Sequence, residues 1–183
     1  AGYLSVLIPE AYGGAGLTLS AAAAVLEEIQ KAGANGAACH AQMYIMGSLL
    51  RHGSDAQKAR YLPQIASGAL RLQAFGVTEP GSGTDTTSIT TFAEKRGDHY
   101  VVNGQKVWTS PAEHSDLLLL LARTTPEDKF AIPTDGVSVF SVDRKKALQA
   151  GLSNSPTRTR HAHYTPPLFL RAHSTSSPKK SCA

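Results

Sequence analysis

The spacing of apolar residues changes at Gly68, and this change limits the chain to an α+β fold. Before it, residues 18–68 repeat apolar side chains at steps of three and four, which is typical of helices. After it, residues 70–143 form short alternating runs separated by turn residues, which is typical of antiparallel strands. We therefore expect a helical segment followed by a small antiparallel β-barrel or sandwich domain.

Two helices are expected in the first part of this helical segment. The first begins at Thr18 or Ser20, which can cap it, and ends before Gly33. The second ends at Gly53. Its apolar stripe, at helical steps, consists of Cys39, Met43, Met46 and Leu50.

A third helix is expected to open at Ser54. Ser54 and Gln57 form a Ser-x-x-Gln capping box, in which each side chain bonds the backbone N–H of the other residue. Pro63 lacks a backbone N–H and fits poorly inside a helix, so that a kink or an early end near Leu62 is predicted.

Six strands and two hairpin turns are expected after the helices. Residues 96–98 (Arg-Gly-Asp) form the first turn, and Asn103-Gly104 is a type I′ signal because both residues accept positive φ. The expected strands are 70–77, 88–95, 99–103, 105–110, 116–123 and 137–143.

Residues 153–183 differ in kind from the rest of the chain. They hold five basic and no acidic side chains, whereas the body has 13 basic and 14 acidic ones, so a nucleic-acid partner is not expected. Their apolar content is too low to offset the entropy of ordering, which predicts disorder. His161 and His163 are spaced like two metal ligands, but no Cys or carboxylate residue lies near them in the sequence. No metal site is therefore expected.

Two further features concern the compartment. No run of about 18 apolar residues occurs, so no membrane span is expected. The two cysteines, Cys39 and Cys182, make a disulfide framework improbable and indicate a reducing compartment.

The stretch AFGVTEPGSGTDTT, residues 74–87, ends a strand abruptly in turn residues. This pattern is typical either of a surface turn or of a loop that binds a ligand. Gly81 and Gly83 begin like a dinucleotide fingerprint, but the third glycine is missing and a strand follows instead of a helix. A nucleotide bound here would therefore be held by a β-domain.

Four motifs, in order along the chain, resemble the acyl-CoA dehydrogenase family: LIPEAYGGAGL, YLPQIASG, AFGVTEPGSGTDT and YVVNGQKVWTS. The resemblance covers residues 1 to about 152. It implies that residues 1–68 are part of an N-terminal helical domain and that 69–152 are the middle, flavin-binding β-domain. Residues 153–183 break the family pattern, and we interpret them as a disordered and out-of-frame tail.

The resemblance also implies a site for FAD. The implied cofactor-binding residues are Phe75, Val77, Thr78, Thr84, Trp108, Thr109 and Ser110. Thr84 falls where the family holds the acyl-CoA thioester and is also the implied substrate-binding residue. Trp108 matches a position that packs against the flavin ring, although a core tryptophan in a small β-domain is the alternative.

Other polar and apolar residues near these motifs have less specific readings. Glu79 could be a general base by its chemistry. The resemblance instead implies that the carboxylate at this position is structural and pairs within the loop. Asp85 is expected to cap the turn. Met43, Met46 and Leu50 would either line an acyl-chain pocket or form a plain core stripe.

The implied activity is α,β-dehydrogenation of acyl-CoA thioesters with electrons passing to FAD. In the family, a glutamate of a C-terminal helical domain is the base, so no catalytic residue is expected within this sequence. The alternative is a non-catalytic, truncated flavin-domain product. The implied partners are acyl-CoA, an electron-transfer flavoprotein or other electron acceptor and, at full length, further copies in a homo-oligomer, in the mitochondrial matrix or bacterial cytoplasm.

Overall fold

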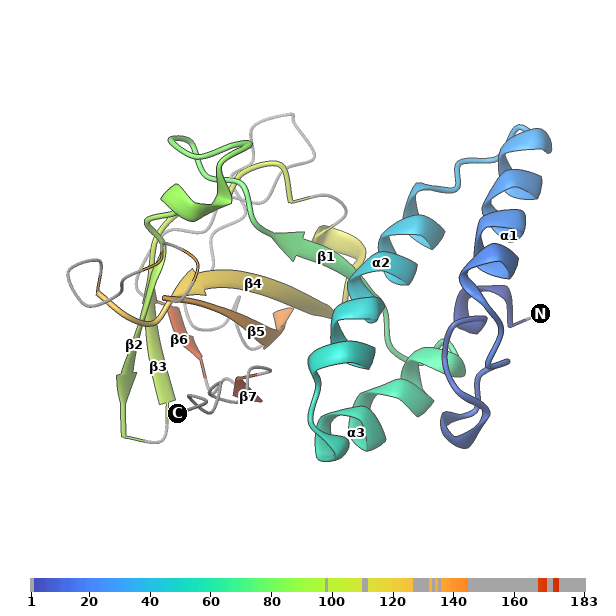
Figure 1. Ribbon diagram of the computed structural model, residues 1–183, viewed down its shortest axis with the longest axis horizontal. Helices are drawn as coiled ribbons and strands as arrows, with labels where there is room; N and C mark the ends of the chain where they lie inside the picture. Colours follow the sequence, from blue (N-terminus) through green and yellow to red (C-terminus); the bar gives the residue numbers. More distant parts are fainter. Residues whose placement is uncertain are drawn as a thin grey trace.

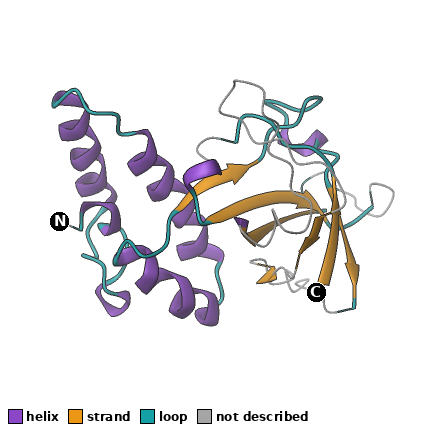
Figure 2. Cartoon of the chain, turned by 180° about the vertical axis from the view of Figure 1, so that it is seen from behind, coloured by secondary structure: helices purple, strands orange, loops and turns teal. Residues whose placement is uncertain are grey.

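The computed structural model divides into a helical part and a sheet that lie side by side (Figure 1). It describes residues 2–97, 99–109, 112–126, 132, 134, 136–144, 168–170 and 173–174, the last two segments as backbone only. The same division is seen from behind in Figure 2. This arrangement agrees with the α+β fold expected from the change of periodicity.

Three α-helices follow two short 3-10 turns, Tyr3–Ser5 and Glu10–Tyr12. Helix α1 spans Leu19–Lys31, α2 spans Ala37–His52 and α3 spans Asp55–Ala66. Thr18 precedes α1 and Gly53 ends α2, as expected, although the Thr18 side chain makes no capping bond.

The capping box of α3 is confirmed. The Gln57 N–H donates to Ser54 Oγ at 3.3 Å, and the Ser54 N–H donates to Gln57 Oε1 at 2.8 Å. Of the kink or early end predicted near Leu62, the early end is wrong, because α3 continues through Pro63 to Ala66. Pro63 is on the exposed face, and the buried side chains of Leu62 and Ile65 hold the helix on both sides of it.

One mixed sheet contains all the described strands. They are β1 (Leu72–Gly76), β2 (Phe92–Arg96), β3 (His99–Asn103), β4 (Leu117–Arg123), β5 (Val137–Asp143), β6 (Leu168–Leu170) and β7 (His173–Ser174). The order is β6-β3-β2-β4-β5-β7, with β1 paired to β4 beside this path. Among the described strands the order does not close into a barrel.

The antiparallel expectation is wrong for the strand that leads into the candidate site. β1 pairs with β4 in parallel, up to the pair Gly76 and Leu120, and β2 meets β4 in a single parallel pair. The chain between β1 and β4 contains a long loop and the whole β2–β3 hairpin, which is enough to return it for parallel pairing. The remaining pairings are antiparallel.

The strand bounds predicted for 99–103 and 137–143 are confirmed. Strand β2 starts four residues later than predicted, because Thr86–Ser88 form a 3-10 turn capped by Asp85. The first hairpin turn joins β2 to β3, with Gly97 at φ 61°, and Asp98 is outside the described residues.

Strands β6 and β7 lie within residues 153–183, where no regular structure is expected. β6 extends the sheet beside β3, and β7 extends it beside β5. Leu168 to Leu170 are the one apolar island of that segment, and a sheet edge offers backbone groups to such a run. The prediction fails for these five positions, and the other residues of the segment lie outside the described part.

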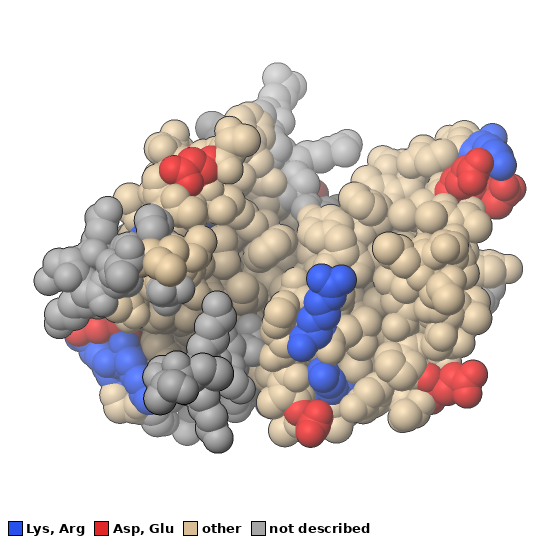
Figure 3. Space-filling view, viewed as in Figure 1, with Lys and Arg blue, Asp and Glu red and all other residues tan. Residues whose placement is uncertain are grey.

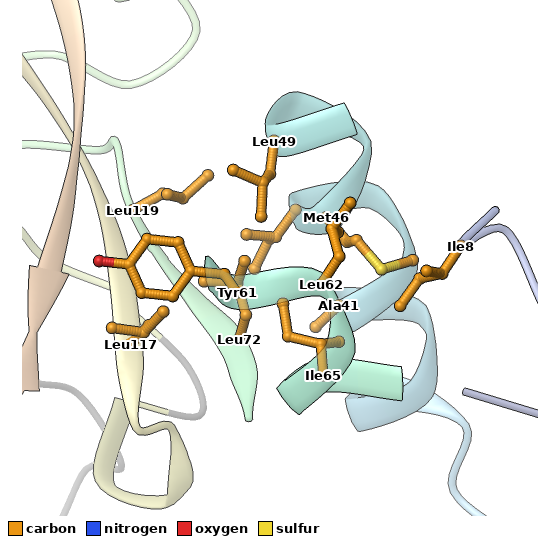
Figure 4. Close-up of a cluster of buried hydrophobic side chains, with 11 residues drawn as sticks. Ile8, Ala41, Met46, Leu49, Tyr61, Leu62, Ile65, Leu72, Leu117 and Leu119 are labelled. Atoms are coloured by element: carbon orange, nitrogen blue, oxygen red, sulfur yellow. The ribbon is translucent and has the colours of Figure 1, made fainter. Parts of the chain in front are cut away.

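Strand β4 is buried on both faces, which explains its uninterrupted leucine run. Leu117 and Leu119 point toward α2 and α3 and join a core cluster with Met46, Leu62 and others (Figure 4). Leu118 and Leu120 join a second cluster with residues of β2, β3 and β5. β1 pairs with this strand, which is packed on both faces, so the position of the end of β1 is fixed by the core.

The apolar stripe of α2 belongs to the core. Met43 packs with Cys39 against α1, and Met46 packs between the helices and the sheet. Both methionines are buried, and Leu50 packs against the same cluster as Met46. Of the two readings of this stripe, the contacts favour core packing.

Candidate functional site

Two loops meet where β1 ends, and backbone hydrogen bonding joins them. The first, residues 77–85, follows β1, and the second, residues 104–109, follows β3. The Val107 N–H donates to the Thr78 carbonyl at 2.9 Å. Lys106 Nζ donates to the Val77 carbonyl at 2.9 Å. Two of the four sequence motifs that carry the family resemblance, AFGVTEPGSGTDT and YVVNGQKVWTS, are therefore neighbours in space.

A buried ion pair strengthens this junction. Lys106 Nζ lies 2.7 Å from Glu79 Oε1, and the side chains are only 1% and 3% exposed. Glu79 also accepts hydrogen bonds from the Thr90 N–H at 2.7 Å, the Thr90 hydroxyl at 2.8 Å and the Thr91 N–H at 3.0 Å. One carboxylate thus ties together the loop after β1, the loop after β3 and the start of β2.

The ionised state of Glu79 is favoured by these donors. Burial alone would raise its pKa, but the hydrogen bonds from Lys106, Thr90 and Thr91 outweigh burial and lower the pKa to about 2. Burial lowers the pKa of Lys106, and its contact with Glu79 opposes that effect. A carboxylate with this low pKa and this set of donors is a poor proton acceptor, in agreement with the structural role expected for Glu79.

Two glycines give the second loop room to approach its neighbours, the end of β1 and the residue before β2. A Cβ on Gly76 would meet Lys106 Cγ at 3.4 Å and Leu120 Cδ1 at 3.3 Å. Gly104 has φ 153°, and a Cβ there would lie 2.3 Å from Thr91 Oγ1. Close backbone approach therefore requires glycine at position 104.

The predicted strand at 105–110 and the type I′ hairpin at Asn103-Gly104 are wrong. Residues 104–109 have no regular structure, and Gly104 serves a close crossing over Thr91 instead of a tight turn. Val107 and Lys106 of this segment bond instead to the loop after β1.

Trp108 has an unusual backbone and an unusual exposure. Its φ is 60°, the only positive value at a non-glycine residue in the described part, and its side chain is 65% exposed. A left-handed backbone at a bulky residue costs about 1–3 kcal/mol and is typical of functional sites. The alternative of a buried core tryptophan is therefore wrong.

Thr109, in contrast to the exposed Trp108, is a buried polar residue. It is fully buried, and its hydroxyl has no hydrogen-bond partner among the described residues. Its carbonyl accepts from the Ala112 N–H at 3.1 Å, which opens the next 3-10 turn. A buried hydroxyl without a partner is costly and calls for an explanation. Ser110 lies outside the described residues.

The remaining predicted site residues are less close to this junction. Val77 and Thr78 are half-buried at the junction itself, whereas half-buried Phe75 packs toward the core shared with the helices. Thr84 is exposed on the far part of the turn, and none of the bonds above joins it to Trp108. The structure therefore brings Val77 and Thr78 together with Trp108 and Thr109.

The turn between Glu79 and Asp85 is ordered by its own bonds. Glu79 and Ser82 exchange two backbone hydrogen bonds, of 2.9 and 3.1 Å. Asp85 accepts from the Thr87 N–H at 2.9 Å and from its hydroxyl at 2.6 Å, which confirms the expected capping role. These bonds fix the path of the glycine-rich turn without using a ligand.

Lys106 is the functional residue that sequence reasoning missed. It lies in the predicted strand 105–110, two residues before the only tryptophan, and no role is predicted for it from the sequence. The available signal was Glu79, a carboxylate expected to be structural, because a buried carboxylate needs a partner. Lys106, in the family motif YVVNGQKVWTS, was a candidate for that partner.

The charged side chains elsewhere are scattered. On the face drawn in Figure 3, the basic side chain at the end of α1 lies beside acidic ones, and Lys31 there pairs with Glu27 and Glu28 at 3.1 and 2.9 Å. In the described part of the chain no three His, Cys, Asp or Glu side chains gather as metal ligands. His161 and His163 lie outside the described residues. Among the described helices, none has the length and apolar character to span a membrane.

Comparison with known proteins agrees with this architecture. The family model for the acyl-CoA dehydrogenase N-terminal domain matches residues 1–69, and that for the middle domain matches residues 74–168. The chain belongs to the acyl-CoA dehydrogenase family. The middle-domain match continues past residue 152, where the resemblance was expected to end.

Individual relatives give the same result. Glutaryl-CoA dehydrogenase of Desulfococcus multivorans is 36% identical over 92% of this chain and 43% of its own length. Mitochondrial isovaleryl-CoA dehydrogenase of Pongo abelii is 37% identical over 85% of this chain and 38% of its own length. A solved steroid acyl-CoA dehydrogenase, Tcur3481-Tcur3483, superposes with a TM-score of 0.77 at 34% identity, over 92% of this chain and 43% of its own. The chain thus spans about two fifths of the length of these relatives.

Proposed function

We propose that this chain carries the flavin-binding wall of an FAD-dependent acyl-CoA dehydrogenase. The observation that carries the proposal is the junction of residues 77–79 with residues 106–109, held by the Val107–Thr78 and Lys106–Glu79 contacts. At this junction an exposed tryptophan in a strained backbone adjoins a buried hydroxyl that has no hydrogen-bond partner among the described residues. Family membership supplies the class of cofactor.

The residues present fit a flavin. An exposed indole offers a flat apolar face on which an aromatic ring can stack. The hydroxyl of Thr109 has a hydrogen bond to give or accept and no described group to receive it. The hydroxyl of Thr78 and the backbone of Val77 are only half-buried and can contribute further polar contacts.

Each residue would have a distinct part in holding the cofactor. Trp108 would cover the ring, and Thr78, Thr109 and Ser110 would orient its polar edge. Thr84 would contact the thioester side of the substrate, and Phe75 would close the base of the wall. When bound, FAD would supply the acceptor for a hydride from the β-carbon of an acyl thioester.

A general base is not among the described residues of this junction. Within residues 77–79 and 106–109 the one carboxylate is Glu79, which bonds to Lys106, Thr90 and Thr91 and has a pKa of about 2. Removing the α-proton would therefore need a group from elsewhere in the protein. This favours the alternative that the chain by itself is a flavin-binding product without turnover.

The partners follow from the same proposal. The substrate would be an acyl-CoA thioester, and an electron-transfer flavoprotein or another acceptor would reoxidise the flavin. A full-length protein would form a homo-oligomer, in the mitochondrial matrix or the bacterial cytoplasm. The out-of-frame tail expected from residue 153 is proposed only for the residues after 168, because the middle-domain match continues to that position.

Titration of the full chain with FAD tests the proposal. Trp108 is the only tryptophan, so quenching of its fluorescence reports binding at this junction directly. We expect saturable but weak quenching, because one wall buries only part of the flavin. Thr78→Val and Thr109→Val should weaken binding, whereas Thr18→Val, which removes a hydroxyl without a capping bond, should not. Absence of saturable quenching would contradict the proposal.

A turnover assay tests the alternative separately. The chain mixed with FAD, a saturated acyl-CoA and an electron acceptor should show no turnover above a buffer control. A general base contributes about 10²–10⁴ in rate, and positioning contributes more. Turnover by this chain would show that it contains a base outside the junction described above.

A further inference from the structure

The Glu79–Lys106 pair does more than join two loops, because it fixes the segment that leads into Trp108. Lys106 is two residues before Trp108, and its ammonium group is fixed by two acceptors, the Val77 carbonyl and Glu79 Oε1. Its stem passes Gly76, where a Cβ would touch Lys106 Cγ. The lysine side chain therefore crosses from the second loop into the base of the first.

The backbone of Trp108 needs such an anchor. A positive φ at a bulky residue persists only where the surrounding structure enforces it. Here the Val107 N–H bonds to Thr78 just before the tryptophan, and the Thr109 carbonyl accepts from Ala112 just after it. With both flanks fixed, the backbone presents the indole at the surface, where Trp108 is 65% exposed.

We propose that Glu79 and Lys106 are positioning residues that preset the Trp108 segment for its ligand before the ligand arrives. The proposal depends on the proposed function only for the identity of that ligand. The ion pair fixes the loop, the loop fixes the strained backbone, and the strained backbone presents the indole beside the Thr78 loop. Removing the pair releases Trp108 from this conformation.

Preorganisation of this kind has a measurable consequence for binding. If only a fraction of molecules holds the binding-competent loop, the apparent dissociation constant rises by the inverse of that fraction. For a loop that is ordered in a tenth of the molecules, the affinity falls about tenfold. A pair with a purely structural role would change stability without changing the mobility of Trp108 in the folded chain.

Steady-state fluorescence anisotropy of Trp108 in the ligand-free chain tests the proposal. Glu79→Gln and Lys106→Met should each lower the anisotropy and raise quenching by acrylamide. Glu94→Gln, which removes the exposed carboxylate of the Glu94–Arg96 pair on β2, is the matched control and should leave both readouts unchanged. Circular dichroism identifies variants that remain folded.

A double variant keeps the test decisive if a single variant unfolds. Glu79→Gln with Lys106→Met leaves no unpaired buried charge, so it should fold better than the worse single variant. Its Trp108 should nevertheless become mobile, because the bond from Lys106 Nζ to the Val77 carbonyl is lost. Anisotropy equal to that of the parent in this folded variant would overturn the proposal.

FAD titration separates this inference from the proposed function. In the variants, the FAD affinity should fall about tenfold relative to the parent and to Glu94→Gln. If the parent itself binds no FAD, the proposed function fails, while the anisotropy of the ligand-free chain still decides the role of the pair. Unchanged anisotropy in all folded variants refutes positioning whatever the outcome with FAD.

Discussion

Two ion pairs stand at opposite ends of β1, and they differ in nearly every physical respect. Arg71 and Asp116, before the strand, are 52% and 26% exposed and lie 3.1 Å apart. Lys106 and Glu79, beyond the strand, are almost fully buried at 2.7 Å. The first pair accompanies backbone bonds that begin the β1–β4 pairing, whereas the second joins two loops that lack a strand partner.

The difference shows in which region charged side chains, and not apolar packing, hold the chain in place. The pairing of β1 with β4 is supported by leucines on both faces, so the exposed pair adds little to it. The two loops at the other end have few apolar side chains to hold them, and a desolvated pair with additional donors replaces that packing. Of these two pairs, the costly buried one is thus at the candidate site.

The largest expected effect is the loss of one partner of the buried pair. Lys106→Met leaves Glu79 buried without its cation, which costs about 3–5 kcal/mol of unfolding free energy. Arg71→Met removes the exposed cation and should cost less than about 1 kcal/mol. Urea unfolding measures both, and equal losses would remove the distinction between the two ends.

Lowering the pH should reduce the contribution of the Glu79–Lys106 pair to the unfolding free energy. The folded-state pKa of Glu79 lies below its ordinary value of 4.5, at about 2. Its contribution is therefore present above pH 4.5 and is lost as the pH falls toward 2, on the order of 3 kcal/mol in total. Unfolding measured between pH 5 and pH 2 should show this loss in the parent and not in Glu79→Gln. A parallel loss in Glu79→Gln would assign it to other carboxylates.

A smaller effect is expected from the two positive-φ glycines around β3. Gly104→Ala places a Cβ 2.3 Å from Thr91 Oγ1 in addition to backbone strain, and should cost about 1–3 kcal/mol. Gly97→Ala, in the β2–β3 turn, has the strain but nothing within 4 Å, and should cost about 1 kcal/mol. Equal losses in urea unfolding would mean that the crossing over Thr91 is not tight.

The two regions also differ in how far the sequence predicts them. The capping box at Ser54 and the bounds of β3 and β5 follow from local patterns, and the structure has them as predicted. Apolar periodicity predicts the helices and strands because each of them buries one or both faces against a core.

The loops at the site are less predictable for a physical reason. Asn103-Gly104 carries the signal of a tight hairpin, but its glycine serves an approach to Thr91, 13 residues earlier, that no local pattern encodes. The Lys106–Glu79 contact likewise joins residues 27 positions apart. The family motifs locate the two segments, and only the fold brings them together.

The most direct measurement of the central claim is a pair of double-mutant cycles in urea unfolding. The cycle of Glu79→Gln and Lys106→Met should give a coupling free energy above about 1.5 kcal/mol, because each single change leaves a buried group unpaired. The cycle of Asp116→Asn and Arg71→Met should give less than about 1 kcal/mol. Equal and small couplings at the two ends would contradict the account.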